Sequence, residues 1–138
     1  MSILYRAEAT ATGGRTGSAK STDGRLAVTL DTPKELGGNG GDGTNPEQLF
    51  AAGYSACFLS ALKHVAGLKK VKLPETTTVT ATVGIGPRED GKGVGLDIAL
   101  RVSVPDIAPD VAEALVAEED IVCPYSHLAH HGAKVHLS

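Results

Sequence analysis

The stretch NPEQLFAAGYSACFLSAL, residues 45–62, decides the fold of this chain. Asn45 is a preferred N-cap residue, and Gln48 completes a capping-box pattern with it. The apolar residues that follow cover most of the circumference of a helix, which is typical of a helix buried on most sides. We therefore predict a central helix that runs to about Ala66, ends at Gly67, and is wrapped by sheet or covered by a second subunit.

Three short strands are expected before this helix. Residues 3–11 alternate between two faces, and residues 25–31 place their leucine and valine side chains on one face. Glycines within residues 13–17 indicate a turn after the first strand, and a second short strand is expected to follow that turn. Together these segments predict an antiparallel meander at the start of the chain.

Further elements are expected after the central helix. Alternating and β-branched residues indicate strands, and a proline followed by an apolar helical pattern indicates a second helix. These elements are strands at 76–85, 94–104 and 133–137, a hairpin loop at 87–93, and a helix at 110–122. The order β-β-β-α-β-β-α-β predicts an α+β class with antiparallel sheet, in which residues 1–138 form a single domain.

Composition narrows the classes of function. The net charge of −3 argues against nucleic-acid binding, which requires a basic face. The longest uncharged run, from Leu49 to Leu62, is shorter than the roughly 18 apolar residues of a membrane span, so it predicts a buried core helix. The first residues lack the apolar core of a signal peptide. We therefore expect a cytoplasmic protein, a compartment in which cysteine pairs tend to be catalytic or metal-binding.

Two cysteines are the first candidates for chemistry. Cys57 lies in the apolar helical run, and Cys123 stands directly before a proline that stops the second predicted helix. Each cysteine alone is also compatible with a small buried core residue. Their separation in the sequence does not show whether the two sulfurs lie close enough to form a disulfide. An apolar site raises the pKa of a thiol, so a working thiolate needs a cation as partner. Arg15, in the turn GGRTG, is the candidate cation.

The histidines near the second cysteine offer a different interpretation. Cys123, His127, His130 and His131 have the spacing of a possible zinc ligand set. Pro124 interrupts a regular helix there, and further ligands would have to come from elsewhere. A zinc-binding or redox-sensing module therefore remains an alternative, and exposed polar histidines are the simpler interpretation.

Three motifs, taken together and in order, resemble one known family. They are ATGGR at 11–15, NPEQLFAAGYSACF at 45–58 and VCPYS at 122–126. This set is similar to the organic hydroperoxide resistance (Ohr) branch of the OsmC/Ohr superfamily. The resemblance implies antiparallel sheets around a central helix that carries the peroxidatic cysteine, in an intertwined homodimer.

The same resemblance implies a function and roles for residues. Family members are thiol-dependent peroxidases that reduce alkyl and fatty-acid hydroperoxides to alcohols, and a lipoyl dithiol carried on a protein regenerates them. Cys57 matches the peroxidatic cysteine and Cys123 the resolving one. Arg15 matches the arginine that activates the thiolate, and Glu47 matches the carboxylate that holds this arginine. The resemblance implies no bound cofactor and no metal.

Substrate preference is the least specified part of the sequence. An apolar pocket walled by residues such as Leu36, Phe50 and Phe58 would favour bulky alkyl hydroperoxides over hydrogen peroxide. The segment 127–131 is richer in histidine than the usual family pattern. An OsmC-type peroxidase with a different range of peroxides is the alternative within the superfamily.

Overall fold

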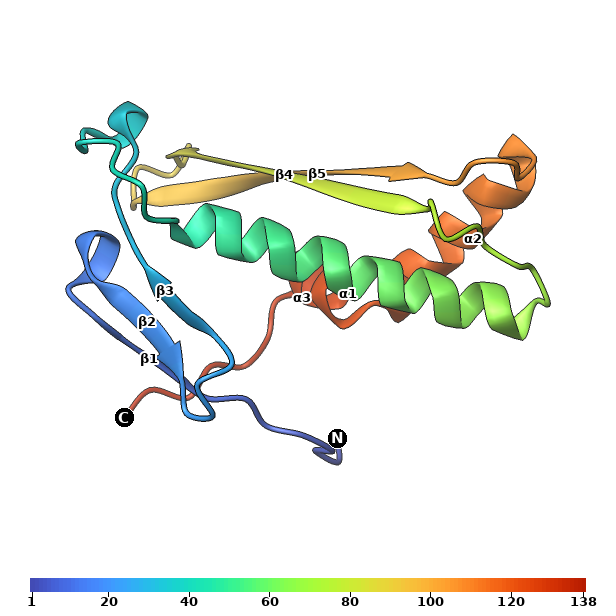
Figure 1. The fold of residues 1–138 in the computed structure, drawn as a ribbon, viewed down its shortest axis with the longest axis horizontal. Helices are drawn as coiled ribbons and strands as arrows, with labels where there is room; N and C mark the ends of the chain where they lie inside the picture. Colours follow the sequence, from blue (N-terminus) through green and yellow to red (C-terminus); the bar gives the residue numbers. More distant parts are fainter. The chain divides into compact units, whose positions relative to one another are not determined.

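The computed structural model describes residues 1–138, and Figure 1 shows its order of elements. The chain forms two compact units, Met1–Leu49 and Phe50–Ser138. The boundary lies within the first turns of the long central helix. The organisation of residues 1–138 as one domain stays a prediction.

The first unit is built on a three-stranded antiparallel sheet. Its strands are β1 (Ala9–Thr12), β2 (Ser18–Ser21) and β3 (Ala27–Thr29), in the order β1-β2-β3. The predicted meander is confirmed, but the first strand is shorter than the alternation at 3–11 suggested. Ala9 pairs with Ser21, the last residue of β2, so residues 3–8 have no strand opposite them to form a ladder.

Glycines shape the turn between β1 and β2. Gly13 and Gly14 have φ values of 75° and 61°, a region that residues with a side chain rarely adopt. A Cβ atom at Gly17 would clash with the carbonyl oxygen of Thr12. These glycines allow a single turn of 3₁₀ helix, η1 (Gly14–Thr16), to form at the end of β1, and Arg15 lies in the middle of it.

The helix α1 (Pro46–Leu68) begins where the capping residues predict. The backbone N–H of Gln48 donates a hydrogen bond to Oδ1 of Asn45 at 2.9 Å, as expected of an N-cap. Pro46 occupies the first helical position, where its missing N–H removes no helical hydrogen bond. The side-chain oxygen of Gln48 accepts a hydrogen bond from the hydroxyl of Thr44, so the second half of the capping box is replaced by this contact.

The end of α1 differs from the prediction in one detail. Gly67 lies inside the helix and does not stop it. The stop comes three residues later, because Lys70 adopts a left-handed conformation with φ of 58°. The N–H of Val71 donates to the carbonyl of Ala66, and that of Lys70 donates to the carbonyl of Gly67, which together form a Schellman motif.

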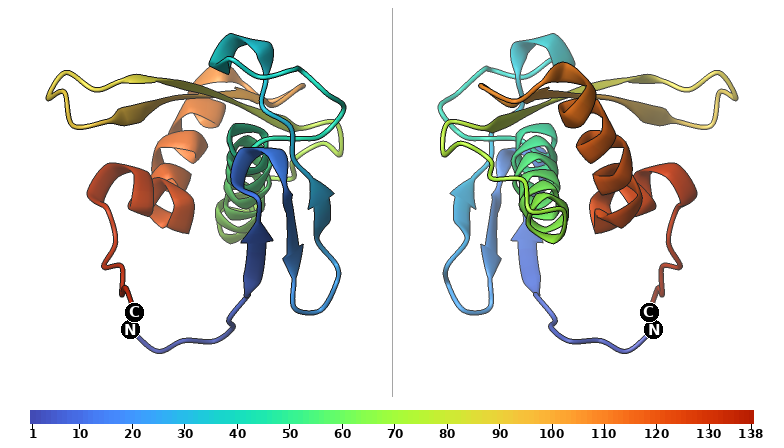
Figure 2. Two further views of the ribbon diagram at one scale, coloured as in Figure 1. Left: turned by 90° about the vertical axis from the view of Figure 1, so that its left-hand side faces the viewer. Right: turned by 90° about the vertical axis from the view of Figure 1, so that its right-hand side faces the viewer.

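The second unit adds a hairpin and two helices. The strands β4 (Thr78–Pro87) and β5 (Val94–Ser103) pair antiparallel over their whole length, which confirms the predicted hairpin. The helix α2 (Pro109–Val122) matches the predicted second helix. In Figures 1 and 2 the hairpin runs along one side of α1, and α2 lies beside α1.

Two sequence predictions near the C-terminus are wrong. A third helix, α3 (Pro124–His131), forms where the sequence analysis expected no helix. The strand predicted at 133–137 does not form, because no strand of this chain pairs with it. Val135 and Leu137 are largely exposed, so no apolar contact holds that segment in a strand either.

The core of the second unit consists of two groups of buried side chains along α1. We call the first the leucine cluster (Leu62, Val65, Ala66 and Leu115). We call the second the cysteine cluster (Tyr54, Phe58 and Cys123, with Cys57 packed against them). Side chains of β5 and α2 contact both clusters. The predicted α+β class with antiparallel sheets is confirmed, whereas the arrangement of the first sheet around α1 stays a prediction.

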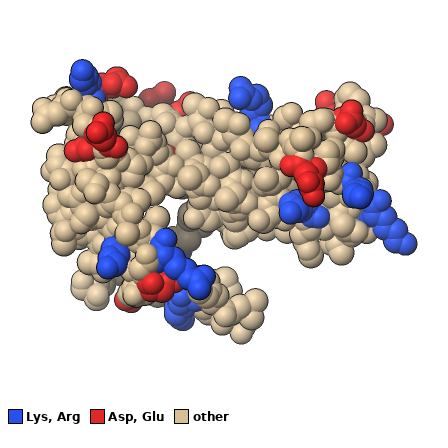
Figure 3. All heavy atoms as spheres, in the orientation of Figure 1, with Lys and Arg blue, Asp and Glu red and all other residues tan.

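Much of α1 is apolar but not buried within its own chain. The helix is long and apolar enough to cross a membrane by length and composition, a test that core helices also pass. Only 33% of its most apolar 18-residue window is buried. Figure 3 shows a largely uncharged surface over the first half of α1. An apolar helix of which a third is buried in its own chain is typical of a helix that a further partner covers.

The leucine cluster generates a stability prediction. Leu62 has no exposed surface, so Leu62→Ala leaves a cavity and is expected to lower the free energy of unfolding by about 2–5 kcal/mol. Leu68→Ala, on an exposed leucine of the same helix, is the matched control and should change it by less than about 0.5 kcal/mol. Urea unfolding followed by circular dichroism measures both. Equal effects of the two substitutions would contradict this description of the core.

Candidate active site

The two cysteines lie side by side in the second unit. The sulfur of Cys123 donates a hydrogen bond to that of Cys57 at 3.7 Å, although 66 residues separate them in the sequence. Both are free thiols, Cys123 has no exposed surface, and Cys57 is partly covered. To form a disulfide of about 2.05 Å, the two sulfurs have to approach by less than 2 Å while an oxidant removes two electrons and two protons.

Cys123 is held in place because two helices meet at it. It is the C-cap residue directly after α2, and its N–H donates to the carbonyl of Glu119 at 2.9 Å. It is also the N-cap of α3, and its carbonyl accepts the N–H of His127 at 2.9 Å. Pro124, at the first position of α3, cannot continue α2 because its nitrogen carries no hydrogen.

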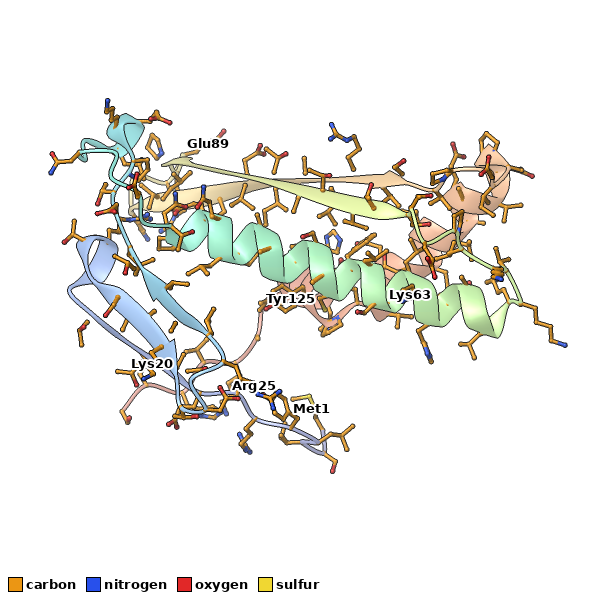
Figure 4. All side chains as sticks on the ribbon, viewed as in Figure 1. Met1, Lys20, Arg25, Lys63, Glu89 and Tyr125 are labelled. Carbon is orange, nitrogen blue, oxygen red and sulfur yellow. The ribbon has the colours of Figure 1, made fainter.

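Aromatic side chains enclose the cysteine pair. The rings of Tyr54 and Tyr125 have centroids 5.8 Å apart, and Figure 4 shows Tyr125 against α1. A Cβ atom at Gly53 would lie 3.0 Å from the Tyr125 hydroxyl, so glycine leaves room for this ring. The Tyr54 hydroxyl hydrogen-bonds the buried Ser126 hydroxyl at 2.7 Å. Sequence reasoning assigned no functional role to these four residues.

Burial opposes ionisation of Cys57. Desolvation is the largest cause that raises the pKa of the Cys57 thiol, and the neighbouring Cys123 and Glu119 raise it further. A backbone hydrogen bond from Tyr125, in the first turn of α3, lowers it. None of these contributions comes from a positively charged side chain. The second unit alone therefore favours the neutral thiol.

The first unit holds an arginine–carboxylate pair. Arg15 donates from both terminal nitrogens to Glu47, with Nη1–Oε2 at 2.9 Å and Nη2–Oε1 at 2.5 Å. This bidentate pair joins the glycine turn to the first turn of α1. Hydrogen bonding by Arg15 lowers the pKa of Glu47, and Glu47 raises that of Arg15. Glu47 is largely covered, whereas a third of the Arg15 side chain stays exposed and free to meet another charge.

A buried carboxyl group near the cysteines was not singled out from the sequence. Glu119 has no exposed surface, and neither of its carboxyl oxygens has a hydrogen-bond partner. Desolvation, with a smaller contribution from Asp120, raises the pKa of Glu119 to about 8. The sequence could have indicated this burial. Glu119 is four residues from Leu115 and from Cys123, so it shares their face of the helix.

The predicted pocket residues are divided between the two units. Phe58 is a buried member of the cysteine cluster, and Phe50 packs against that cluster. Leu36 lies in the first unit at the end of a 3₁₀ turn, η2 (Lys34–Leu36), and is exposed. Their function as one pocket stays a prediction.

The histidine segment does not form the ligand set that the zinc alternative requires. The structure contains no group of three or more His, Cys, Asp or Glu side chains placed to hold a metal ion. His130 contacts Asp120 at 3.0 Å, and the rings of His127 and His131 lie 4.8 Å apart on the exposed side of α3. Cys123, in contrast, is fully buried. The structure therefore does not support a zinc site on Cys123 and these histidines.

Comparison with protein families matches residues 38–138 to the family described as OsmC-like protein. This chain belongs to the OsmC-like family. The organic hydroperoxide resistance protein of Xanthomonas axonopodis pv. citri is 52% identical over 125 residues, which cover 91% of this chain and 87% of that protein. The resemblance to the Ohr branch is thereby confirmed.

Solved structures agree with this OsmC-like membership. The crystal structure of an organic hydroperoxide resistance protein from Legionella pneumophila matches with a TM-score of 0.88 at 45% identity. That of OhrB from Bacillus subtilis matches with a TM-score of 0.85 at 36% identity. Each match covers 99% of this chain and 98% of the other. The α+β fold is thus the one seen in solved Ohr structures.

The sulfur–sulfur distance generates a chemical prediction. Treating the reduced protein with diamide is expected to form the Cys57–Cys123 disulfide within one chain, because both sulfurs are already adjacent. Peptide mapping under non-reducing conditions identifies the linked peptides. Cys57→Ser is the control and should give no linkage within the chain. Disulfides only between chains, or free thiols after treatment, would contradict the observed geometry.

Glu119 generates a prediction about pH and stability. Its pKa in the folded state is about 8, above the unfolded value near 4.5, so the folded protein holds this proton more tightly. The contribution to stability is complete below pH 4.5 and is lost as the pH rises through 8. By linkage the loss is at most a few kcal/mol.

Thermal unfolding between pH 4.5 and 9 measures this loss. The melting temperature of the wild type should fall relative to that of Glu119→Gln as the pH rises. Glu118→Gln is the matched control, because Glu118 is half exposed and pairs with Lys69 at 2.8 Å. If the melting temperatures of wild type and Glu119→Gln change with pH in the same way, Glu119 is not buried in the way described.

Proposed function

We propose that this chain is a thiol-dependent peroxidase that reduces organic hydroperoxides to alcohols. The observation that carries the proposal is the 3.7 Å contact between Cys57 and Cys123 inside an apolar cluster. Two free thiols at this distance can pass through a sulfenic acid to a disulfide. The names of the Ohr relatives point to organic hydroperoxides as the substrate class.

The first step is attack by the Cys57 thiolate on the terminal oxygen of the hydroperoxide. The O–O bond breaks, the alkoxide leaves and takes up a proton to become the alcohol, and Cys57 becomes a sulfenic acid. The thiol of Cys123 then attacks the Cys57 sulfur. The S–O bond breaks, water leaves with the proton of Cys123, and the Cys57–Cys123 disulfide forms.

A dithiol closes the cycle by two thiol–disulfide exchanges. One thiolate of the reductant attacks the protein disulfide, and its second thiol resolves the mixed disulfide. The reductant leaves as a cyclic disulfide, and both cysteines return to thiols. A lipoyl dithiol carried on a protein is the proposed donor, on the strength of the family resemblance. No bound cofactor or metal takes part in these steps.

Arg15 is the proposed activator of the Cys57 thiolate. The pKa of Cys57 is raised by burial, and no cation of the second unit lowers it, so the thiolate needs a positive charge from elsewhere. A guanidinium about 4 Å from the sulfur contributes roughly 4 kcal/mol at an effective dielectric near 20. This equals about three pKa units. The bidentate pair with Glu47 would keep the guanidinium oriented toward thiolate and peroxide.

The apolar surroundings favour bulky substrates. Phe50, Phe58 and, from the first unit, Leu36 are the proposed walls of a pocket for the alkyl chain. Hydrogen peroxide has no apolar part and gains nothing from such a pocket. Turnover of cumene hydroperoxide should therefore exceed that of hydrogen peroxide, which also separates an Ohr-type from an OsmC-type range of substrates.

A homodimer belongs to the same proposal. Only a third of the most apolar part of α1 is buried in its own chain, and a second copy of the chain is the proposed cover for the rest. We place the protein in the cytoplasm, where lipoylated proteins can reduce it. The net charge of −3 argues against nucleic acid as a partner.

The test is consumption of cumene hydroperoxide by the purified protein with dihydrolipoamide as reductant. Cys57→Ser should abolish turnover, and Cys123→Ser should abolish rapid regeneration by the dithiol. Arg15→Ala should lower kcat/KM by roughly 10²–10³-fold, because the thiolate loses about 4 kcal/mol of stabilisation at most. Arg25→Ala is the matched control, since Arg25 is an almost fully exposed turn arginine of the same unit.

The outcomes separate the peroxidase from a structural role of the cysteines. Retained turnover in Cys57→Ser, or no turnover in the wild type, would refute the proposed function. Equal losses in Arg15→Ala and Arg25→Ala would refute the role of Arg15 and leave the peroxidase in place.

A further inference from the structure

Glu119 is the one buried charged side chain of this protein that the proposed reaction does not use. Its two carboxyl oxygens have no hydrogen-bond partner. A buried polar group without a partner is destabilising, so its presence beside a pair of reactive sulfurs calls for an explanation.

The position of Glu119 follows from the helix that carries it. Leu115, Glu119 and Cys123 are spaced by four residues and form one buried stripe, and the first and last of them pack against side chains of α1. Leu115 belongs to the leucine cluster, and Cys123 belongs to the cysteine cluster. Glu119 therefore lies between the two clusters.

Few titratable groups surround this carboxyl. From α1, Tyr54 and Cys57 are close enough for the Glu119 charge to raise their pKa values. From its own helix, Asp120 acts on it, and Asp120 is itself paired with His130 of α3. The strands contribute the apolar side chains Val79, Ile98, Leu100 and Val102 to the two clusters. Asp97 of β5 also lies in this region, because it lines the same pocket as Tyr54 and Asp120. No cation is paired with Glu119.

We propose that Glu119 holds the proton that balances the Cys57 thiolate. The carboxyl is neutral while Cys57 is charged, and it takes over the negative charge when the two sulfurs are oxidised. The inference rests on the proposed function, because it assumes that Cys57 works as a thiolate. Two negative charges at this buried site would repel each other, so the site carries one.

Proton balance shows what this exchange of charge does. Without Glu119, a thiolate, a thiol and a hydroperoxide give a disulfide, an alcohol and one hydroxide ion. With Glu119, the carboxyl proton neutralises that hydroxide, and the products are the disulfide, the alcohol, water and the Glu119 carboxylate. The negative charge stays inside the protein. When a dithiol regenerates the Cys57 thiolate, Glu119 takes up the proton again.

The pKa of the Glu119 carboxyl sets the pH range in which it releases its proton on oxidation of the two sulfurs. With the free, neutral Cys57 thiol, Glu119 ionises with a pKa of about 8. A Cys57–Cys123 disulfide is also uncharged, so we expect the same range in the oxidised protein. With Cys57 as a thiolate, repulsion keeps Glu119 neutral to a higher pH. At about pH 9 the carboxyl is therefore neutral in the reduced protein and charged in the oxidised protein. At about pH 7 it is neutral in both, and oxidation draws its proton from solvent.

The test counts protons during oxidation of the reduced protein in weak buffer with an indicator dye. Wild type should take up about one proton per disulfide at pH 7 and close to none at pH 9. Glu119→Gln should take up about one proton at both values. Glu118→Gln, which removes an exposed charge one residue earlier, should behave as wild type.

Two oxidants distinguish a failure of this inference from a failure of the proposed function. Diamide also needs one proton to oxidise a thiolate and a thiol, so it gives the same count without peroxidase chemistry. Disulfide formation with diamide but not with cumene hydroperoxide would refute the peroxidase only. An uptake in wild type that stays near one proton at pH 9, with either oxidant, would refute the role of Glu119. The wild-type comparison decides this even if Glu119→Gln does not fold.

Discussion

The interruption of one helix at Cys123 is the constraint on which the rest of the second unit depends. Because α2 ends and α3 begins at this residue, its backbone is held by hydrogen bonds from both sides, to Glu119 and from His127. Pro124 makes the break obligatory, since it cannot continue α2. The result is a thiol with no exposed surface, 3.7 Å from Cys57 on the central helix. A straight helix through residues 109–131 could not present Cys123 to α1 and also give Tyr125 its contact with Cys57.

Burial of the sulfurs brings an electrostatic cost that the rest of the chain offsets. Burial in the apolar cluster raises the pKa of the Cys57 thiol. The thiolate therefore has to be stabilised by a nearby positive charge or by a hydrogen-bond donor. The first turn of α3 supplies one through the N–H of Tyr125. Arg15, held by Glu47 in the first unit, is the proposed second source. A neutral Glu119 completes this account, because a charged one would oppose the thiolate.

The sequence predicted the parts of this structure that depend on local chemistry. The Asn45 cap, the β4–β5 hairpin and the start of α2 all follow from residue types within a few positions of each other. It did not predict α3, because Pro124 indicates where a helix stops and equally where one starts. Glu119 was not predicted to be buried, because it stands in an acidic run, residues 118–120, that is typical of an exposed helix surface. Only its spacing of four residues from Leu115 and from Cys123 indicates that it lies on the buried face. The strand expected at 133–137 depends on a partner strand, which no local pattern can supply.

The most direct test of the central claim is a single oxidation followed by mass spectrometry. Fully reduced protein is mixed with one equivalent of cumene hydroperoxide, quenched in acid and digested without reductant. The account predicts that the chain loses two hydrogens, that the peptides of Cys57 and Cys123 are joined, and that one equivalent of alcohol is formed. In Cys123→Ser, the same treatment should leave one added oxygen on Cys57. Unchanged thiols in the wild type, with the hydroperoxide intact, would contradict the account.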